Sequence, residues 1–447
     1  MSEFDYRSYF LNNVEGLRKL IQIPSVFDAS AVTAELPFGE KPHEALLFMK
    51  KVLEDDGFKV INYDDQVISA SIGKGKERID IASHVDVVDV ADGWDKDPFS
   101  GDIDDEFIYG RGSQDMKGPG WLIYLAVKLI RDSGIKLNKE IRMVYGCDEE
   151  VMMNDMKHYL SLVEAPSFAF TPDGSFPLAI GEKGALTWTV KQKYEGIVRN
   201  MKCGYQYNVV PDVAECTVKA DNIKNVLLYC LNNHINGEAE ITEEGLKILI
   251  HGKAVHASTP ELGHNAINDL LKLLNDVYGE KQFGELYEAF RDCHGKGSEL
   301  DYDIEPMGKL TVSLGILNIE NGELFGMVDS RYPYGVTSKT LTENLQKHLP
   351  SYGVELIYDD PPTLQDENDP YVLALLNAYN EVNESNEKPI ISGGVSYSKV
   401  FGHCVCFGPV FPYEEKRFHK VNEKISIDSC VKALEIYHKA ILNILNI

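Results

Sequence analysis

The sequence predicts an α/β protein of two domains. The first has a mostly parallel central sheet flanked by helices, and the second is an inserted α+β domain with an antiparallel sheet. Three observations support this. A chain of 447 residues is too long for one ordinary hydrophobic core. Short apolar strands alternate with helical patterns up to about residue 180, which is typical of a parallel sheet. From about residue 181, apolar and polar residues alternate, as in antiparallel strands with one solvated face.

Apolar residues at helical and strand spacing define the elements of the first domain. We expect helices over residues 5–21, from about Pro42 up to Gly57, over 121–130, and up to about residue 160. The expected strands cover residues 58–61, 67–72, 79–83, 107–109, 140–145 and 168–170. The carboxyl ends of parallel strands meet at one edge of a sheet, where ligands bind in open α/β folds.

The second domain is predicted as an insertion, which divides the chain into residues 1–180, 181–366 and 367–447. Its expected strands cover residues 186–193, 214–219, 246–250, 310–319 and 324–328, and its helices 265–278 and 341–348. An acidic, proline-containing stretch at 361–370 returns the chain to the first domain. That domain is then completed by helices at 371–381 and 426–444 and a strand at 404–407.

Composition excludes several classes of partner. Lys and Arg number 44 against 70 Asp and Glu, so the formal net charge is 44 − 70 = −26. This charge argues against nucleic acid or an anionic membrane as a partner. No apolar run is long enough to span a bilayer, and residues 1–7 lack the apolar core of a signal peptide. The eight cysteines are scattered without a C-x-x-C pair, which predicts reduced thiols in a cytoplasmic protein.

Imidazole and carboxylate side chains follow several of the predicted strands. His84 ends one strand, Asp115 follows the next, and Glu149 with Glu150 and then Asp173 follow two more. Each has a simpler interpretation, respectively a core histidine, a helix N-cap, a solvated acidic pair and a turn residue. Their occurrence at consecutive strand ends favours a shared site for Zn²⁺ or Mn²⁺ instead.

Four short motifs stand out, namely residues 83–88 (SHVDVV), 110–119 (GRGSQDMKGP), 148–150 (DEE) and 171–173 (TPD). They resemble the two-metal aminopeptidase-like metallopeptidase family, which contains carnosinases, aminoacylases and succinyl-diaminopimelate desuccinylases. Further runs at 37–39, 94–99 and 176–184 are similar to those of bacterial dipeptidases of the peptidase V type. The resemblance covers essentially the whole chain. It implies a metal-dependent dipeptidase that cleaves short peptides with a metal-activated water.

The resemblance also implies roles for individual residues. The ligands of two divalent ions would be His84, Asp115, Glu150, Asp173 and His419, with Asp115 bridging both ions. Glu149 would be the general base, and its neighbour Glu150 would face the other way on an extended backbone. Asp86 would orient the imidazole of His84. His403 is the alternative to His419 but lacks the surrounding motif.

The inserted domain would act as a lid that brings further groups to the substrate. His256 matches a family histidine that stabilises the oxyanion, and its surrounding motif selects it over His251 and His264. The substrate-binding positions implied by the resemblance are Asn208, Arg331, Gly393, Gly394 and Ser396. The chain departs from the family by carrying Ser396 and Lys399 where threonine and arginine are usual, and Asp89 where proline is common.

Other functions fit parts of the same pattern. An N-acyl-amino-acid deacylase would share every predicted metal ligand. A binding protein that has lost catalysis is disfavoured, because the ligand set and Glu149 are both present. The chain contains no Gly-x-x-x-x-Gly-Lys-Ser/Thr motif, which disfavours nucleotide binding. The large insertion resembles monomeric family members, so a monomer is expected, with a dimer as the alternative.

Overall fold

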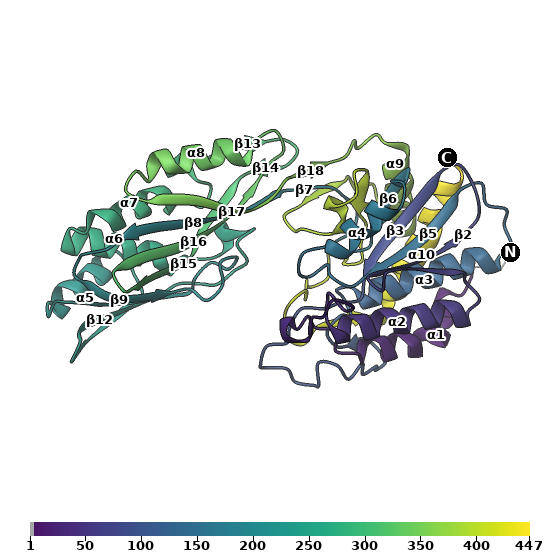
Figure 1. Ribbon diagram of the computed structural model, residues 1–447, viewed down its shortest axis with the longest axis horizontal. Coiled ribbons are helices and arrows are strands. Elements are labelled where there is room, and N and C mark those ends of the chain that lie inside the picture. The colour runs from purple at the N-terminus through teal and green to yellow at the C-terminus, as the bar shows by residue number, and fades with distance from the viewer. Residues whose placement is uncertain (1–3) are drawn as a thin grey trace. The chain divides into compact units, whose positions relative to one another are not determined.

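The chain divides into two compact units. The computed structural model describes residues 4–447, so the first three residues of the predicted segment 1–180 lie outside the described residues. One unit comprises the chain up to Gly181 together with Leu364–Ile447, and the other comprises Glu182–Thr363 (Figure 1). The predicted boundaries, after residues 180 and 366, lie within a few residues of these.

The first unit is built on a nine-stranded sheet in the order β1-β2-β5-β3-β6-β20-β7-β18, with β19 paired to β7. Strands β5, β3, β6 and β20 are parallel neighbours, and antiparallel strands flank them. The predicted, mostly parallel sheet is therefore confirmed. The strands are β1 (Val60–Tyr63), β2 (Val67–Ile72), β3 (Arg78–His84), β5 (Glu140–Gly146), β6 (Phe168–Thr171), β7 (Ala179–Glu182), β18 (Thr363–Leu364), β19 (Ile390–Ser392) and β20 (Cys404–Cys406).

Helices cover both faces of this sheet, which explains why its central strands are apolar on both sides. In β3, Ile79 and Ile81 join the larger core, while Ala82 joins a smaller core on the opposite face. The larger core packs under α1 (Tyr6–Ile21), α2 (Glu40–Asp55), α3 (Lys117–Asp132), α9 (Pro370–Asn383) and α10 (Ile427–Leu445) (Figure 1). The smaller core packs under α4 (Asn154–Leu162) and the 3₁₀ turn η4 (Tyr397–Lys399). A further 3₁₀ turn, η1, spans Ala29–Ala31.

One predicted strand lies outside the central sheet. The strand β4 (Phe107–Tyr109) pairs antiparallel with β21 (Lys424–Ser426) in a separate two-stranded sheet. The expectation that Asp115 follows a strand of the parallel sheet is therefore wrong. Three residues are too short a run to show which partner they pair with, so the sequence pattern did not separate β4 from its neighbours.

The second unit contains an eight-stranded antiparallel sheet in the order β11-β12-β10-β9-β15-β16-β8-β17. Residues Leu246, Ile248 and Ile250 alternate into its core while the intervening positions are partly exposed, as predicted for a half-solvated sheet. The strands are β8 (Gly184–Lys193), β9 (Val198–Cys203), β10 (Val213–Val218), β11 (Gly237–Thr242), β12 (Gly245–His251), β15 (Thr311–Glu320), β16 (Glu323–Tyr332) and β17 (Gly353–Asp360), with β13 (Asp303–Ile304) and β14 (Gly308–Lys309) as a separate pair.

Helices α5 (Ile223–Asn232), α6 (Ala266–Tyr278), α7 (Lys281–Phe290) and α8 (Ser338–His348) complete this unit, with 3₁₀ turns η2 (Pro260–Leu262) and η3 (Lys296–Ser298). The sequence predicted α6 and α8 but not α5 or α7. Helix α5 exposes Leu227, Leu228 and Leu231, which blurs its apolar stripe. Helix α7 is ten residues long and contains Gly284, a poor helix former. Over the described residues, neither unit contains a helix with the length and apolarity needed to cross a bilayer.

Candidate active site

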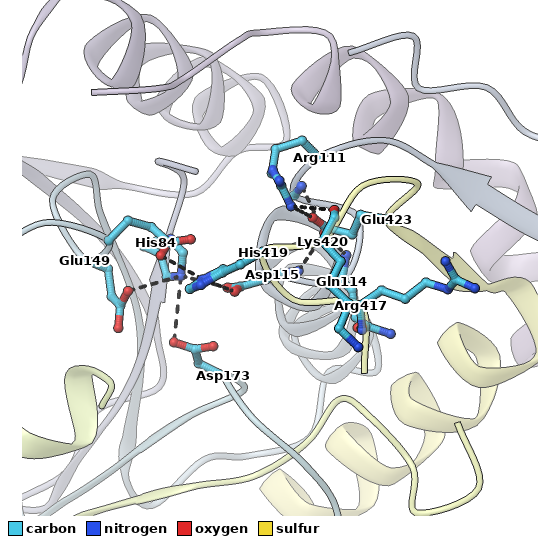
Figure 2. A network of polar contacts seen from close by, with 12 residues as sticks. His84, Arg111, Gln114, Asp115, Glu149, Asp173, Arg417, His419, Lys420 and Glu423 are labelled. Carbon is cyan, nitrogen blue, oxygen red and sulfur yellow. Dashed lines mark hydrogen bonds and ion pairs between the residues drawn. The ribbon is translucent and has the colours of Figure 1, made fainter. Parts of the chain in front are cut away.

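A cluster of ionisable side chains lies at the carboxyl ends of the parallel strands in the first unit. His84 is the last residue of β3, Glu149 lies in the turn after β5, and Asp173 follows β6 (Figure 2). His84 Nε2 is 3.8 Å from Glu149 Oε2 and 3.7 Å from Asp173 Oδ2. The register of three adjacent parallel strands brings these residues together, as the sequence predicted.

Asp115 and His419 reach the same cluster from irregular segments. Asp115 Oδ1 lies 3.3 Å from His84 Nε2, and its Oδ2 lies 3.1 Å from His419 Nε2. His419 Nε2 is also 3.1 Å from Glu150 Oε2. Asp115 thus stands between the two histidines with one oxygen toward each. Helix α3 has Met116 at its N-cap and no side-chain cap among the described residues, so Asp115 does not serve as the cap.

The donor atoms fit two divalent cations. Two groups can offer converging ligand atoms, His84 with Glu149 and Asp173, and His84 with Asp115 and Glu150. Among the described residues, the buried atoms His84 Nε2, Glu149 Oε1 and Glu150 Oε1 have no hydrogen-bond partner. Buried polar atoms are normally satisfied, and these three belong to residues of the two ligand groups, so they fit a site that holds cations. Imidazole nitrogen and carboxylate oxygen suit Zn²⁺ and Mn²⁺.

The electrostatics of the cluster favour positive charge. Burial lowers the pKa of His84, but the carboxylates of Asp115 and Asp86 outweigh it and raise that pKa well above its ordinary value. Desolvation likewise lowers the pKa of His419, yet the carboxylates of Glu150 and Asp115 raise it to about 11. A field that holds protons on both imidazoles would also attract a cation in their place.

Glu149 has the environment of a proton acceptor. Burial raises the pKa of Glu149 well above its ordinary value, and the carboxylate of Asp173 raises it further. A carboxylate whose pKa is raised accepts a proton more readily than an ordinary one. The same residue belongs to one of the two ligand groups, so geometry alone allows either a base or a ligand at this position.

Buried carboxylates fix the backbone on which these residues lie. His84 Nδ1 is hydrogen-bonded to the backbone carbonyl of Asp86 at 2.9 Å, while the Asp86 carboxylate is farther away, at 3.4 Å. That carboxylate instead accepts from the backbone N–H of Glu150 at 3.0 Å. The Glu149–Glu150 pair lies in a turn, so the expected extended backbone is wrong, and both carboxylates reach the cluster.

Two residues that support this site were missed in the sequence. Asp155, at the start of α4, accepts from the backbone N–H groups of Cys147 and Asp148 and from the hydroxyl of Tyr397. Glu423 accepts from the loop that contains Asp115. No sequence pattern marks this role of Glu423, because its partners are backbone N–H groups of a segment distant in the chain. His403, the alternative ligand, instead contacts the Ser167 carbonyl and Asp369.

Within the second unit, His256 and Asn208 lie on adjoining segments. The Asn208 carbonyl accepts from the N–H of Ala257, and Val209 pairs with His256 in an isolated bridge. The backbone N–H of Ser258 donates to His256 Nδ1 at 3.1 Å. In a neutral imidazole this leaves the proton on Nε2, which can then act as a donor. His264, by comparison, pairs with Asp269.

Arg331 is placed near this pair by the sheet of the second unit. It lies on β16 opposite Thr311, whose hydroxyl donates to the carbonyl of Ala257 at 3.4 Å. The Arg331 guanidinium is buried and donates from Nε and Nη2 to the two oxygens of Asp329, at 3.2 and 3.1 Å. This pairing occupies one edge of the guanidinium and fixes its plane, while Nη1 lies on the other edge.

The predicted loop at 393–396 belongs to the first unit and follows β19. Gly393 is partly buried, and Gly394 is exposed with its N–H donated to the Ser392 hydroxyl. Ser396 is buried at the N-cap of η4, where its hydroxyl accepts from the N–H of Ser398 and contacts Cys406 Sγ. The Ser396 hydroxyl thus has structural partners in addition to any contact with substrate.

Imidazoles and carboxylates clustered at the parallel strand ends of an α/β unit are suited to bind the divalent cations that many hydrolases use. The chain belongs to peptidase family M20/M25/M40, whose sequence profile matches residues 81–443. The predicted resemblance to this group of metallopeptidases is confirmed, and so is the hydrolase class.

Individual relatives agree with this assignment. A protein of Staphylococcus aureus (strain USA300) named "Putative dipeptidase" is 32% identical over 465 residues, covering 98% of this chain and 97% of the relative. Human carnosine dipeptidase 1 has a TM-score of 0.62 at 16% identity, covering 99% of this chain and 98% of that chain. A Bacillus subtilis protein described as a dinuclear metal binding peptidase has a TM-score of 0.53 at 10% identity, covering 98% and 99%. At such identities, the two solved structures show a common fold.

Proposed function

We propose that this chain is a dipeptidase that uses two divalent ions, Zn²⁺ or Mn²⁺, to hydrolyse the peptide bond of short peptides. The observation that carries the proposal is the position of Asp115, whose two oxygens face His84 and His419 separately. A carboxylate in this position can serve two cations at once. The dipeptidase names of the staphylococcal relative and of the human structural neighbour support this substrate class.

Each residue of the cluster then has a role. One ion would be held by His84, Asp115 and Asp173, and the other by Asp115 together with Glu150 and His419. When bound, two such ions polarise the scissile carbonyl and make a nearby water more acidic. Glu149, left free of both, would take a proton from the attacking water and deliver it to the departing amine.

The second unit would supply the remaining contacts by closing as a lid over the substrate. His256, with its proton on Nε2, would donate to the carbonyl oxygen as it gains negative charge. Arg331, held in plane by Asp329, would bind the C-terminal carboxylate of the peptide with its other edge. Asn208 and the backbone at Gly393 and Gly394, with Ser396, would orient the same end of the substrate.

Three matched substrates test this proposal on protein loaded with Zn²⁺ or Mn²⁺. We expect rapid cleavage of a dipeptide and slow cleavage of its C-terminal amide, because the amide loses a charge-assisted contact with Arg331. Such a loss costs about 2–5 kcal/mol in a desolvated site, or roughly thirty-fold to several thousand-fold in kcat/KM. The N-acetylated dipeptide should also be cleaved slowly, and the chelated protein should be inactive.

The outcomes separate the candidate functions. Efficient cleavage of the amide would exclude Arg331 as the carboxylate clamp. A preference for the N-acetylated compound would identify an N-acyl-amino-acid deacylase, which shares the cluster but not the free amino end of the substrate. Full activity of the chelated protein would exclude the metal-dependent mechanism.

We further propose that the protein acts in the cytoplasm as a monomer on small peptides. All eight cysteines are free thiols, and seven of them are buried, which suits a reducing compartment. The net charge of −26 disfavours nucleic acid and anionic membranes as partners.

A further inference from the structure

We propose that Glu423 is a positioning residue that holds one of the two metal pockets together. Its buried carboxylate joins the loop that carries Asp115 to the turn that carries His419, two segments that are distant in the sequence (Figure 2). The inference rests on the proposed two-ion function and adds to it a residue that touches neither ion.

One oxygen of Glu423 organises the Asp115 loop. Glu423 Oε1 accepts from the backbone N–H groups of Gly112 at 3.0 Å, Gln114 at 2.8 Å and Asp115 at 3.1 Å. Glu423 is fully buried, so no water replaces these bonds in the folded protein. The loop therefore folds around this oxygen, and the orientation of the Asp115 backbone depends on it.

The other oxygen connects the loop to the turn. Glu423 Oε2 accepts from Arg111 Nη1 at 2.7 Å, and the Arg111 guanidinium is likewise buried. The same guanidinium donates to the carbonyl of Lys420, the residue after His419, and to the carbonyl of Asp89, both at 3.2 Å. A single ion pair thus fixes the loop against the backbone beside His419.

Two more hydrogen bonds run between the same segments. The backbone N–H of Arg417 donates to Gln114 Oε1 at 2.7 Å, and the N–H of Gly110 donates to the Glu423 carbonyl at 3.0 Å. The links lie on both sides of His419 in the sequence. The imidazole of His419 therefore lies where the loop that contains Asp115 meets the turn.

His419 needs this external support. It has a left-handed backbone conformation, with φ of 58°, and 57% of its side chain is exposed, so local packing does not fix the ring. Its ring nitrogen nevertheless lies 3.1 Å from both Asp115 and Glu150. By contrast, His84 and Asp173 adjoin neighbouring parallel strands, whose register places them without help from Glu423.

The pocket of Asp115, Glu150 and His419 takes ligands from both segments that Glu423 joins, whereas the pocket of His84 and Asp173 takes only Asp115 from them. The pocket containing His419 should therefore depend on Glu423 more than the pocket containing Asp173. Changes to residues that orient metal ligands typically weaken metal affinity by about 10- to 100-fold. Glu423→Gln keeps an oxygen that can accept from the loop but turns an amide toward Arg111. Glu423→Ala removes both functions and should have the larger effect.

The test is a metal titration of the full chain after chelation, by calorimetry with Zn²⁺ and by visible absorption with Co²⁺. Asp80→Asn is the matched control. Asp80 is also fully buried and accepts from an arginine, Arg78 Nε at 2.8 Å, and from the Tyr159 hydroxyl at 2.9 Å, but it lies away from the cluster. Arg111→Lys serves as a second variant in case Glu423→Ala does not fold.

We expect the parent to bind two ions, and Asp80→Asn to bind both with the same affinities as the parent. The Glu423 variants should bind the second ion about 10- to 100-fold more weakly and the first ion with a smaller loss, because the pocket of His84 and Asp173 shares only Asp115 with the disturbed segments. The absorption from the second Co²⁺ should be lost. If the Glu423 and Arg111 variants bind both ions as the parent does and only their melting temperature falls, the positioning role is refuted. If the parent itself binds fewer than two ions, the proposed function fails, and this inference with it.

Discussion

Replacing Glu149 with glutamine separates the two roles that the cluster allows this residue. As a general base, Glu149 needs its ionised carboxylate to accept a proton, and glutamine has none. As a metal ligand, Glu149 would contribute a charged oxygen to the group of His84 and Asp173. We propose the role of base for Glu149; burial and the carboxylate of Asp173 raise its pKa, which suits a proton acceptor.

The expected magnitude follows from that role. Loss of a positioned general base lowers kcat by roughly 10²- to 10⁴-fold, which corresponds to about 3–5 kcal/mol in the activation free energy. Metal content should stay at two ions, since His84, Asp115 and Asp173 remain for one pocket. Because the exchange is nearly isosteric and Glu149 Oε1 has no hydrogen-bond partner among the described residues, the fold should be little affected.

Glu150→Gln is the matched control, since the neighbouring carboxylate is also turned into the cluster and contacts His419 at 3.1 Å. We expect Glu150→Gln to lose one ion and Glu149→Gln to retain both, measured as metal content after equal loading and desalting, with kcat for a dipeptide measured in parallel. If Glu149→Gln loses an ion while Glu150→Gln keeps both, the two assignments are reversed. If Glu149→Gln keeps both ions and normal turnover, Glu149 is not the base.

Two further predictions concern the histidines His84, His419 and His256. The surrounding carboxylates raise the pKa of His419 to about 11 and that of His84 well above its usual range, so we expect a metal ion to compete with protons at both imidazoles. Calorimetry in buffers of different ionisation enthalpy should therefore show a net release of protons when the ions bind. The absence of any release would contradict the raised pKa values of the two histidines. His256→Ala should lower kcat by roughly 10²- to 10³-fold with little change in KM, because the Nε2–H donor of His256 acts mainly in the transition state. An unchanged kcat would exclude His256 from the mechanism.

Much of the fold could be predicted because apolar periodicity encodes both the type of an element and the face that it buries. The helix α3 and the strands β3, β5 and β6 follow this rule, and so do the antiparallel strands β10 and β12. The helices that were missed, α5 and α7, are those in which exposed leucines or an internal glycine weaken the pattern. Helix prediction from local sequence therefore fails where the buried positions do not follow helical spacing.

The sequence by itself determined that His84, Glu149 and Asp173 would meet. His84 ends one strand, and Glu149 and Asp173 follow the two parallel strands on either side of it, so the geometry of the sheet leaves them little freedom. Only the tertiary structure decided how Asp115 and His419 join them. Asp115 follows a strand outside the central sheet, and its loop is held by Glu423, which is 308 positions away in the chain. Contacts of this kind are made by backbone N–H groups of irregular segments, which every residue type except proline provides, so they leave no periodic signal in the sequence.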